Sequence, residues 1–146
     1  MDARGQKIIF MKKQPLIIYS DGGARGNPGP AAAGYVVGGK SFGEYIGETT
    51  NNVAEYKALI FGLKKGISLL GKEKAAETDV QCNLDSELLV RQLNGQYKVK
   101  NANLKPLFLE ALSAKRSYKS VSFTHIPREI NKEADRMVNL TLDNLH

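Results

Sequence analysis

The sequence predicts an α/β fold in which helices cover a mixed sheet, and three observations lead to this prediction. A continuous apolar run at 16–21 has the character of a buried central strand. Two strand-like runs follow at 32–37 and 42–48, and the Gly38-Gly39 pair between them indicates a hairpin. The rest of the chain alternates helical periodicity with short apolar runs, as in a layered α/β domain.

The first predicted helix runs from Val53 to Leu70. The segment Thr49-Thr-Asn-Asn52 before it offers several N-cap residues, and Gly71 after it offers a C-terminal cap. The remaining predicted elements are a strand at 80–85, a helix at 86–93, a helix at 104–116, a strand at 120–126 and a helix at 129–145. No linker or repeat divides the chain, so we expect one domain over 1–146, with 1–14 as a lead-in and an extended stretch at 7–11.

Composition narrows the class of protein. The chain has 146 residues, of which 42% are hydrophobic and 25% charged, which is typical of one soluble globular domain. No apolar run is long enough to span a membrane, and residues 1–7 do not have the pattern of a signal peptide. Cys82, the single cysteine, excludes an intramolecular disulfide and cannot form a zinc cluster alone. We therefore expect a cytoplasmic monomer with no membrane partner.

The charge balance is basic. Lys and Arg total 21 against 15 Asp and Glu, which gives a formal net charge of +6 and a pI near 9.4. Such a charge is compatible with a nucleic-acid partner, and equally with an ordinary solvated surface. The lysines are scattered in pairs, so charge alone is weak support.

Two acids close apolar strands. Asp21 ends the first strand, and a glycine- and proline-rich stretch follows it. Asp85 ends the strand at 80–85, on the face opposite that of Val80, Cys82 and Leu84. The alternative for Asp85 is a cap on the helix that begins at Ser86.

Two further acids stand at the head of helical stripes. Glu55 precedes Leu59, Gly62 and Gly66 on a small, apolar face that is suited to packing on a sheet. Asp135 precedes Val138 and Leu142 in the last helix. The alternatives are a glutamate favoured by the helix dipole and a surface acid beside neighbouring cations.

The four acids predict a metal site if they meet at one edge of the sheet. Crowded carboxylates repel one another unless they share cations. Oxygen ligands without a cysteine or histidine cluster favour Mg²⁺ or Mn²⁺ over zinc. Two such ions roughly 4 Å apart are the usual arrangement for phosphodiester cleavage by in-line attack of water.

The motifs that carry these acids resemble the ribonuclease H type 1 family. They are Tyr19-Ser-Asp-Gly-Gly-Ala-Arg-Gly-Asn-Pro-Gly-Pro30, Thr49-Thr-Asn-Asn-Val-Ala-Glu-Tyr56, Leu84-Asp-Ser86 and Asn131-Lys-Glu-Ala-Asp135. The resemblance covers about 16–142, in the family's order. It implies a ribonuclease H-like fold, with a central five-stranded mixed sheet and helices on both faces. It also implies cleavage of the RNA strand of RNA/DNA hybrids, which leaves a 5′-phosphate and a 3′-hydroxyl.

By position, the resemblance makes Asp21, Glu55, Asp85 and Asp135 the catalytic acids that bind two Mg²⁺ or Mn²⁺ ions. It implies that Gly22, Gly23 and Ala24 lie in a turn after the first acid and reach RNA 2′-hydroxyls. The other implied substrate contacts are Asn27, Asn51 and Asn52 in the minor groove, Thr50 and Asn101 at a DNA phosphate, and Ser86.

The chain departs from the family's pattern in three places, one of which is Glu87, where many members have a neutral amide. The chain has no Trp, and Tyr97-Lys-Val-Lys-Asn101 stands where the family's best-studied bacterial members carry a tryptophan-rich basic protrusion. His125 has the spacing of the family's loop histidine, but its surroundings predict a strand, so Glu129 or Arg128 is an alternative for proton transfer. The compact version resembles archaeal members.

Two other functions compete with the nuclease. A module that binds hybrid or double-stranded RNA without cutting predicts a missing acid, and all four are present. A nucleotide-binding loop after Asp21 is excluded, because residues 22–30 lack both G-x-G-x-x-G and a Gly-Lys-Ser/Thr ending. Cleavage of double-stranded RNA in addition to hybrid stays open.

Overall fold

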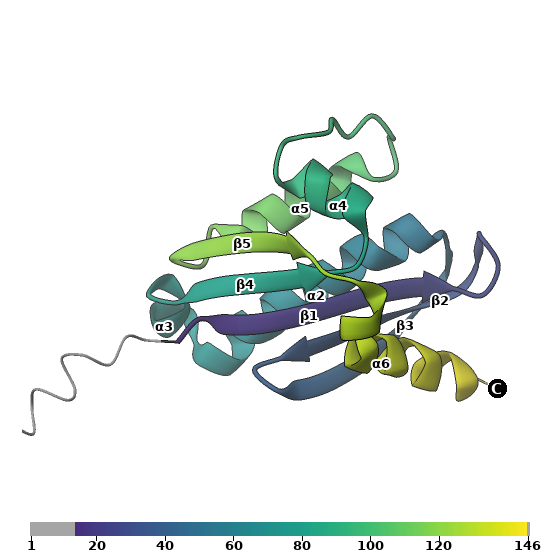
Figure 1. Ribbon diagram of the computed structural model, residues 1–146, viewed down its shortest axis with the longest axis horizontal. Helices are drawn as coiled ribbons and strands as arrows, with labels where there is room; N and C mark the ends of the chain where they lie inside the picture. Colours follow the sequence, from purple (N-terminus) through teal and green to yellow (C-terminus); the bar gives the residue numbers. More distant parts are fainter. Residues whose placement is uncertain (1–13, 146) are drawn as a thin grey trace, which may run out of the picture.

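The structure is a computed structural model that describes residues 14–145, so the extended stretch expected at 7–11 lies outside the described residues. Its centre is a five-stranded sheet with the order β3-β2-β1-β4-β5 (Figure 1). The strands are β1 Leu16–Ala24, β2 Gly29–Val37, β3 Lys40–Thr49, β4 Asp79–Leu84 and β5 Ser120–His125. The pairs β1–β2 and β2–β3 are antiparallel, whereas β4 runs parallel to both β1 and β5. The predicted mixed sheet is confirmed.

Helices cover both faces of this sheet. They are α2 Asn51–Leu70, α3 Lys72–Ala76, α4 Glu87–Leu93, α5 Lys105–Lys115 and α6 Lys132–Asp143, with a 3-10 turn, η1, at Arg128–Ile130. Adjacent residues of β1 show the two layers, because Gly22 lies against α2 and Gly23 faces α6. Figure 1 shows α6 alone on its face and α2, α4 and α5 on the other. Within residues 14–145, no helix has both the length and the apolar character needed to cross a membrane.

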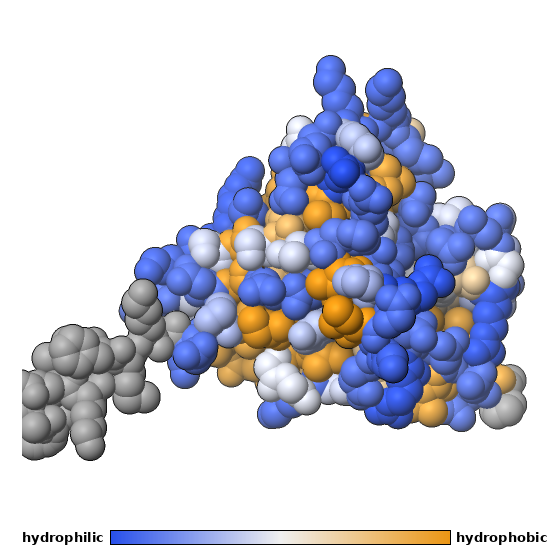
Figure 2. Space-filling view, in the orientation of Figure 1, coloured by the Kyte–Doolittle hydropathy of each residue, from blue (hydrophilic) through white to orange (hydrophobic). Residues whose placement is uncertain are grey.

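The main core fills the space between the sheet and α2. Ile18, Leu59 and Leu63 have no exposed surface, and the buried Tyr56 hydroxyl donates a 2.6 Å hydrogen bond to Gln92 of α4. Burial of side chains of this size stabilises the fold by roughly 2 kcal/mol each. In Figure 2, hydrophilic side chains cover α6 and the projecting loop between α4 and α5, while hydrophobic ones gather over the middle of the sheet. This packing holds the strands, and the side chains that they carry, in fixed positions.

The first strand is longer than predicted. It continues beyond Asp21 to Ala24, and Gly22 and Gly23 pair with β2. The expectation that Gly22, Gly23 and Ala24 form a turn is therefore wrong. The reversal lies at residues 25–28, where the backbone amide of Arg25 donates to the carbonyl of Pro30. Gly22 also leaves room for α2, because a Cβ there would lie 2.2 Å from the carbonyl carbon of Ala54.

The other predicted boundaries hold with local changes. The hairpin at Gly38-Gly39 is confirmed, and both glycines have positive φ. Thr50 caps α2 by accepting a hydrogen bond from the amide of Val53. The short helix α3 was not predicted, because five residues are too few for periodicity.

The final predicted helix is two elements. Residues 128–130 form η1, in which the amides of Ile130 and Asn131 donate to carbonyls three residues earlier. The helix α6 begins only at Lys132, because the backbone of Asn131 is not helical (φ −97°, ψ 33°).

Candidate active site

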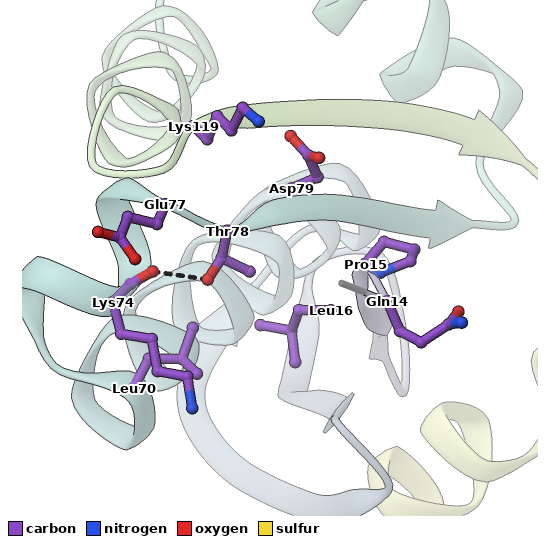
Figure 3. Close-up of a pocket in the computed structure, with 9 residues that line it drawn as sticks. All are labelled: Gln14, Pro15, Leu16, Leu70, Lys74, Glu77, Thr78, Asp79 and Lys119. Atoms are coloured by element: carbon purple, nitrogen blue, oxygen red, sulfur yellow. Dashed lines mark hydrogen bonds between the residues drawn. The ribbon is translucent and has the colours of Figure 1, made fainter. Parts of the chain in front are cut away.

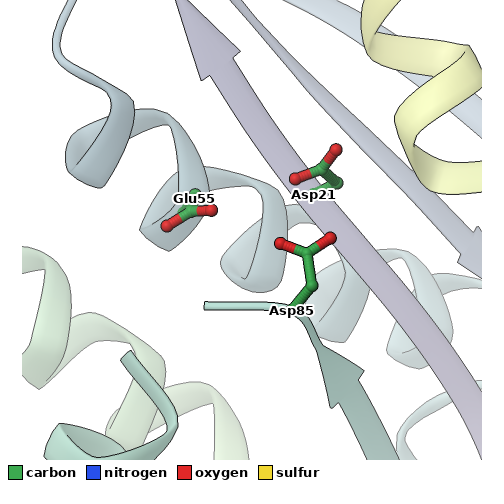
Figure 4. Close-up of side chains that lie close together, drawn as sticks. All are labelled: Asp21, Glu55 and Asp85. Carbon is green, nitrogen blue, oxygen red and sulfur yellow. The ribbon is translucent and has the colours of Figure 1, made fainter. Parts of the chain in front are cut away.

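Strand register brings Asp21 and Asp85 together. β1 and β4 are parallel neighbours, and Ser20 pairs with Leu84. The next residue on each strand path is an acid, and adjacent strands lie only about 4.8 Å apart. Figure 4 shows the two carboxylates close together, with Asp21 on β1 and Asp85 just beyond the end of β4. The alternative role of Asp85 as a helix cap is not needed, because Ser86 caps α4 by accepting from the amide of Leu89 at 3.3 Å.

Helix α2 adds Glu55 to the pair. Its first turn lies against β1 at Gly22, where an added Cβ would lie 2.2 Å from the carbonyl carbon of Ala54. This close approach places one ligand oxygen each of Asp21, Glu55 and Asp85 within 4.8 Å of one another (Figure 4). The predicted meeting of these three acids is thus seen in the structure.

Helix α6 brings the fourth acid from the opposite face. Gly34 pairs with Asp21 across β1 and β2, and a Cβ at Gly34 would lie 2.2 Å from the carbonyl oxygen of Ala134. The next residue, Asp135, lies beside Asp21 and raises the pKa of Asp21 through its charge and a side-chain hydrogen bond. Asp135 is half-buried rather than a surface acid.

Burial and mutual repulsion perturb this cluster. The pKa of Asp21 is raised to about 8, first by burial and then by the charges of Asp85, Glu55 and Asp135. Burial also raises the pKa of Glu55 to about 7, against the lowering effects of a hydrogen bond from Ser86 and the charge of Arg128. Carboxylates with such pKa values are held in a site that lacks sufficient positive charge of its own.

The donor set fits a hard divalent cation. The trio of Asp21, Glu55 and Asp85 offers carboxylate oxygens only, and no other group of His, Cys, Asp or Glu in the described residues has comparable geometry. Half-buried oxygen ligands at this spacing suit Mg²⁺ or Mn²⁺. A bound cation would also relieve the repulsion that raises the pKa of Asp21.

The cluster opens into a hollow of about 300 Å³, which we call the acid hollow; Asp21, Glu55, Asp135 and Arg128 are among the residues that line it. Gly23 and Ala24 line the same hollow from the end of β1. A strand end, rather than a turn, thus presents the backbone that was predicted to contact substrate.

Two predicted substrate residues hold the rim of this site together. The side-chain oxygen of Asn51 accepts from the amide of Ala24 at 2.8 Å, and that of Asn27 accepts from the amide of Asn51 at 3.0 Å. Neither side-chain nitrogen donates to another described residue. Their amide groups therefore tie the β1–β2 loop to the start of α2 and still have donors to offer.

Three further predicted substrate residues, Thr50, Asn52 and Asn101, line a neighbouring hollow of about 490 Å³, which we call the amide hollow; Ser86 is not among its lining residues. Asn27, Thr50, Asn51, Asn52, Asn101 and Asn103 line it. Asn101 comes from the loop between α4 and α5, and its side-chain oxygen accepts from the amide of Asn103 at 2.7 Å. The structure thus brings Thr50 and Asn101 together, although they are far apart in the sequence.

Two of the three residues considered for proton transfer lie outside the acid hollow. His125 ends β5, exposed, and pairs with Leu84, so its predicted strand placement is confirmed. Glu129 is exposed on η1. Arg128, the third residue considered, lines the hollow and acts electrostatically on Glu55.

Sequence reasoning gave no role to Asn131. This residue is 1% exposed, and its side-chain nitrogen donates to both the carbonyl of Ser20 and the carboxylate of Asp85. An asparagine before a helix is usually an N-cap, so no local signal distinguishes it. Only its burial marks it.

A larger hollow of about 720 Å³ lies at the opposite end of the sheet, away from the acids (Figure 3). Leu16, Leu70, Lys74 and Lys119 are among the residues that line it, and the Thr78 hydroxyl donates to the carbonyl of Lys74. It brings together no acidic cluster among the described residues. Among the described residues, the grouped metal-ligand candidates are therefore Asp21, Glu55 and Asp85.

Comparison with known proteins places the fold and the motifs in one family. Residues 20–141 match the family described as reverse transcriptase-like. The chain is 46% identical to LC11-RNase H1, whose structure was solved in complex with an RNA/DNA hybrid; the match covers 88% of this chain and 96% of that one, with a TM-score of 0.81.

Two curated relatives also match this chain in sequence. Ribonuclease HI of Halobacterium salinarum is 38% identical, over 86% of this chain and 63% of the relative. The bifunctional protein Rv2228c of Mycobacterium tuberculosis is 36% identical over 88% of this chain, which spans only 35% of that protein's length. With the five-stranded mixed sheet and the acids at its edge, these matches show that the chain belongs to the ribonuclease H type 1 family.

Proposed function

We propose that this chain is a metal-dependent endoribonuclease that hydrolyses the RNA strand of RNA/DNA hybrids. The observation that carries the proposal is the convergence of Asp21, Glu55 and Asp85 within 4.8 Å at one edge of the sheet. Asp135 lies beside them. The relative whose structure contains an RNA/DNA hybrid supports the choice of substrate.

The four acids would hold two Mg²⁺ or Mn²⁺ ions. When bound, such a pair supplies an activated water and stabilises the charge on the attacking and leaving oxygens of an in-line displacement. This chemistry leaves a 5′-phosphate and a 3′-hydroxyl.

The chain's own residues set the geometry of the acids. The hydroxyl of Ser86 hydrogen-bonds to Glu55, and Arg128 favours the ionised form of that carboxylate. Strand β1, the end of β4 and the first turn of α2 keep Asp21, Asp85 and Glu55 on a rigid frame. Side chains held in this way need little rearrangement when substrate arrives.

The rim of the site suits the minor groove of a hybrid. Such a groove is wide and displays 2′-hydroxyls, which backbone groups and amide side chains can contact without reading sequence. Gly23 and Ala24 offer the backbone, and Asn27 and Asn51 offer amide donors. We infer that these residues select the RNA strand.

The amide hollow is suited to a backbone phosphate of the DNA strand. The hydroxyl of Thr50 and the amides of Asn52 and Asn101 are polar groups without charge. Phosphate contacts fix the register of a nucleic acid without specifying its sequence. A phosphate held here would set which RNA bond lies over the acids.

A cleavage assay tests the proposal. Labelled RNA/DNA hybrid, double-stranded RNA and double-stranded DNA are incubated with the chain and Mg²⁺ or Mn²⁺, beside Asp21→Asn. We expect cleavage of the hybrid's RNA strand and a loss of about 10³-fold or more in the variant, since a metal ligand is removed. Absence of hybrid cleavage with either metal, or an equally active variant, would refute the nuclease. Cleavage of double-stranded RNA would widen the substrate range.

A further inference from the structure

The side chain of Asn131 connects the elements that carry three of the four acids. Its nitrogen donates at 2.9 Å to the carbonyl of Ser20, which immediately precedes Asp21, and at 2.9 Å to a carboxylate oxygen of Asp85. Its backbone carbonyl accepts the amide of Asp135 at 3.2 Å. β1, the end of β4 and the start of α6 thus meet at one residue.

The chemistry of the contacts explains why this residue is an asparagine. Both partners of the side-chain nitrogen are acceptors, so the amide orientation is determined by its neighbours. A carboxylate here would have no donor, and a hydroxyl would have only one. A lysine or arginine would donate but would neutralise Asp85 and compete with a cation. An amide supplies two donors and leaves the charge of Asp85 available.

The burial of Asn131 carries a cost that local structure does not offset. The side-chain oxygen is buried without a hydrogen-bond partner among the described residues. A buried polar atom without a partner destabilises the folded state. An unpaired atom of this kind, directly behind a metal-ligand candidate, is expected where a site rather than the fold determines the residue.

We propose that Asn131 is a positioning residue for the metal site: it orients the carboxylate of Asp85 for the cation and holds that carboxylate in register with Asp21. This inference rests on the proposed function, because it concerns the same acids. Removal of a hydrogen-bond partner of a metal ligand weakens metal binding by about 10–100-fold. Asn131 touches neither substrate nor cation and acts through Asp85.

The first test measures Mn²⁺ binding without nucleic acid, by the electron paramagnetic resonance signal of free Mn²⁺. For Asn131→Ala we expect the dissociation constant to rise by about tenfold. The matched control is Asn83→Ala. Asn83 is another buried amide of the same sheet, but its side-chain partner is Gln81. Asn83→Ala is expected to lower the unfolding temperature and to leave the Mn²⁺ dissociation constant unchanged. Equal constants for wild type and Asn131→Ala would overturn the proposal.

The second test does not require an Asn131 variant to fold. The side-chain amide protons of Asn131 are followed by ¹H–¹⁵N NMR in the wild type and in Asp85→Asn. Loss of the charged acceptor is expected to shift one of the two proton signals, and Mg²⁺ is expected to shift the same signal in the wild type. Unchanged signals in both comparisons would show that Asn131 serves the fold alone.

The two proposals fail separately. If hybrid is not cut but Asn131→Ala binds Mn²⁺ about tenfold more weakly than the wild type does, the nuclease is wrong and the positioning role stands. If hybrid is cut and Asn131→Ala binds Mn²⁺ and cuts as the wild type does, the positioning role is wrong and the nuclease stands.

Discussion

Gly22 lies against the backbone of Ala54, so close that an added Cβ would be 2.2 Å from the Ala54 carbonyl carbon and 2.4 Å from the amide nitrogen of Glu55. This contact sets the distance between β1 and α2 at the point where each carries an acid. The neighbouring residues are Asp21 and Glu55, and one carboxylate oxygen of each lies within 4.8 Å of the other and of one from Asp85. The glycine is a structural requirement of the site, whether or not its backbone touches substrate.

Gly22→Ala is expected to destabilise the fold by about 3 kcal/mol, because backbone atoms of a helix cannot yield to a methyl group as a side chain can. The measurement is urea unfolding. The control is Gly23→Ala, whose Cβ would lie 3.4 Å from a Val138 methyl, an ordinary contact. Equal unfolding midpoints for the two variants would contradict the role of the close approach.

The sequence predicts the acids of the two parallel strands better than it predicts their neighbours. Asp21 and Asp85 each follow an apolar run, and they meet because β1 and β4 are adjacent in a register that pairs Ser20 with Leu84, although Asp21 lies within β1 rather than at its end. The helical acids point toward the sheet by periodicity, but their distance depends on Gly22 and Gly34. Those glycines look like turn residues in a sequence, and the requirement for them arises from helices that pack from both faces.

The contact of Asn131 with Ser20 and Asp85 could not be predicted. It joins residues 111 and 46 positions apart, respectively. No periodicity reports such a distance, and an amide before a helix is common. The same reasoning explains the amide hollow, where Asn101 reaches Thr50 from a loop with no regular pattern.

The metal-free protein is expected to lose stability as pH rises. The pKa values of Asp21 and Glu55 are raised to about 8 and about 7, so between about pH 4 and pH 8 the folded state binds protons that the unfolded chain has released. Their contribution is therefore favourable at low pH and lost as pH rises through these values. Asp21→Asn removes the largest part of this effect. Near pH 8 we expect its free energy of unfolding to exceed that of the wild type by about 1–3 kcal/mol, and near pH 4 we expect no such gain.

Urea unfolding in a chelator, across this pH range, checks the sign. Glu73→Gln removes the same charge from an exposed side chain of α3 and is expected to leave the pH dependence as it is in the wild type. If Asp21→Asn were less stable than the wild type at pH 8, the buried carboxylates would not be destabilising the metal-free protein.

Arg128→Ala is expected to slow hybrid cleavage near neutral pH by about threefold, because a cation that favours the ionised form of Glu55 is lost. In the metal-free protein the pKa of Glu55 is expected to rise further. Arg128→Lys keeps the charge and should recover part of the rate.

His125→Ala, at an exposed strand end, is expected to change the rate by less than about tenfold. A larger loss in His125→Ala, or an unchanged rate in Arg128→Ala, would contradict the assignment.

Asn101→Asp is expected to raise the KM for hybrid by about tenfold while kcat changes by less than about threefold. The new carboxylate is the same size and can still accept from the amide of Asn103, so the loop keeps its hydrogen bond. It also places a negative charge in the amide hollow beside Thr50, where we propose that a DNA phosphate binds.

Lys119→Gln, at the hollow on the opposite end of the sheet, lowers the net charge by the same one unit and serves as the control for long-range attraction. Steady-state kinetics at two salt concentrations separate the two effects, because a local repulsion acts on Asn101→Asp alone. Equal KM values for the two variants would show that the amide hollow does not hold the phosphate.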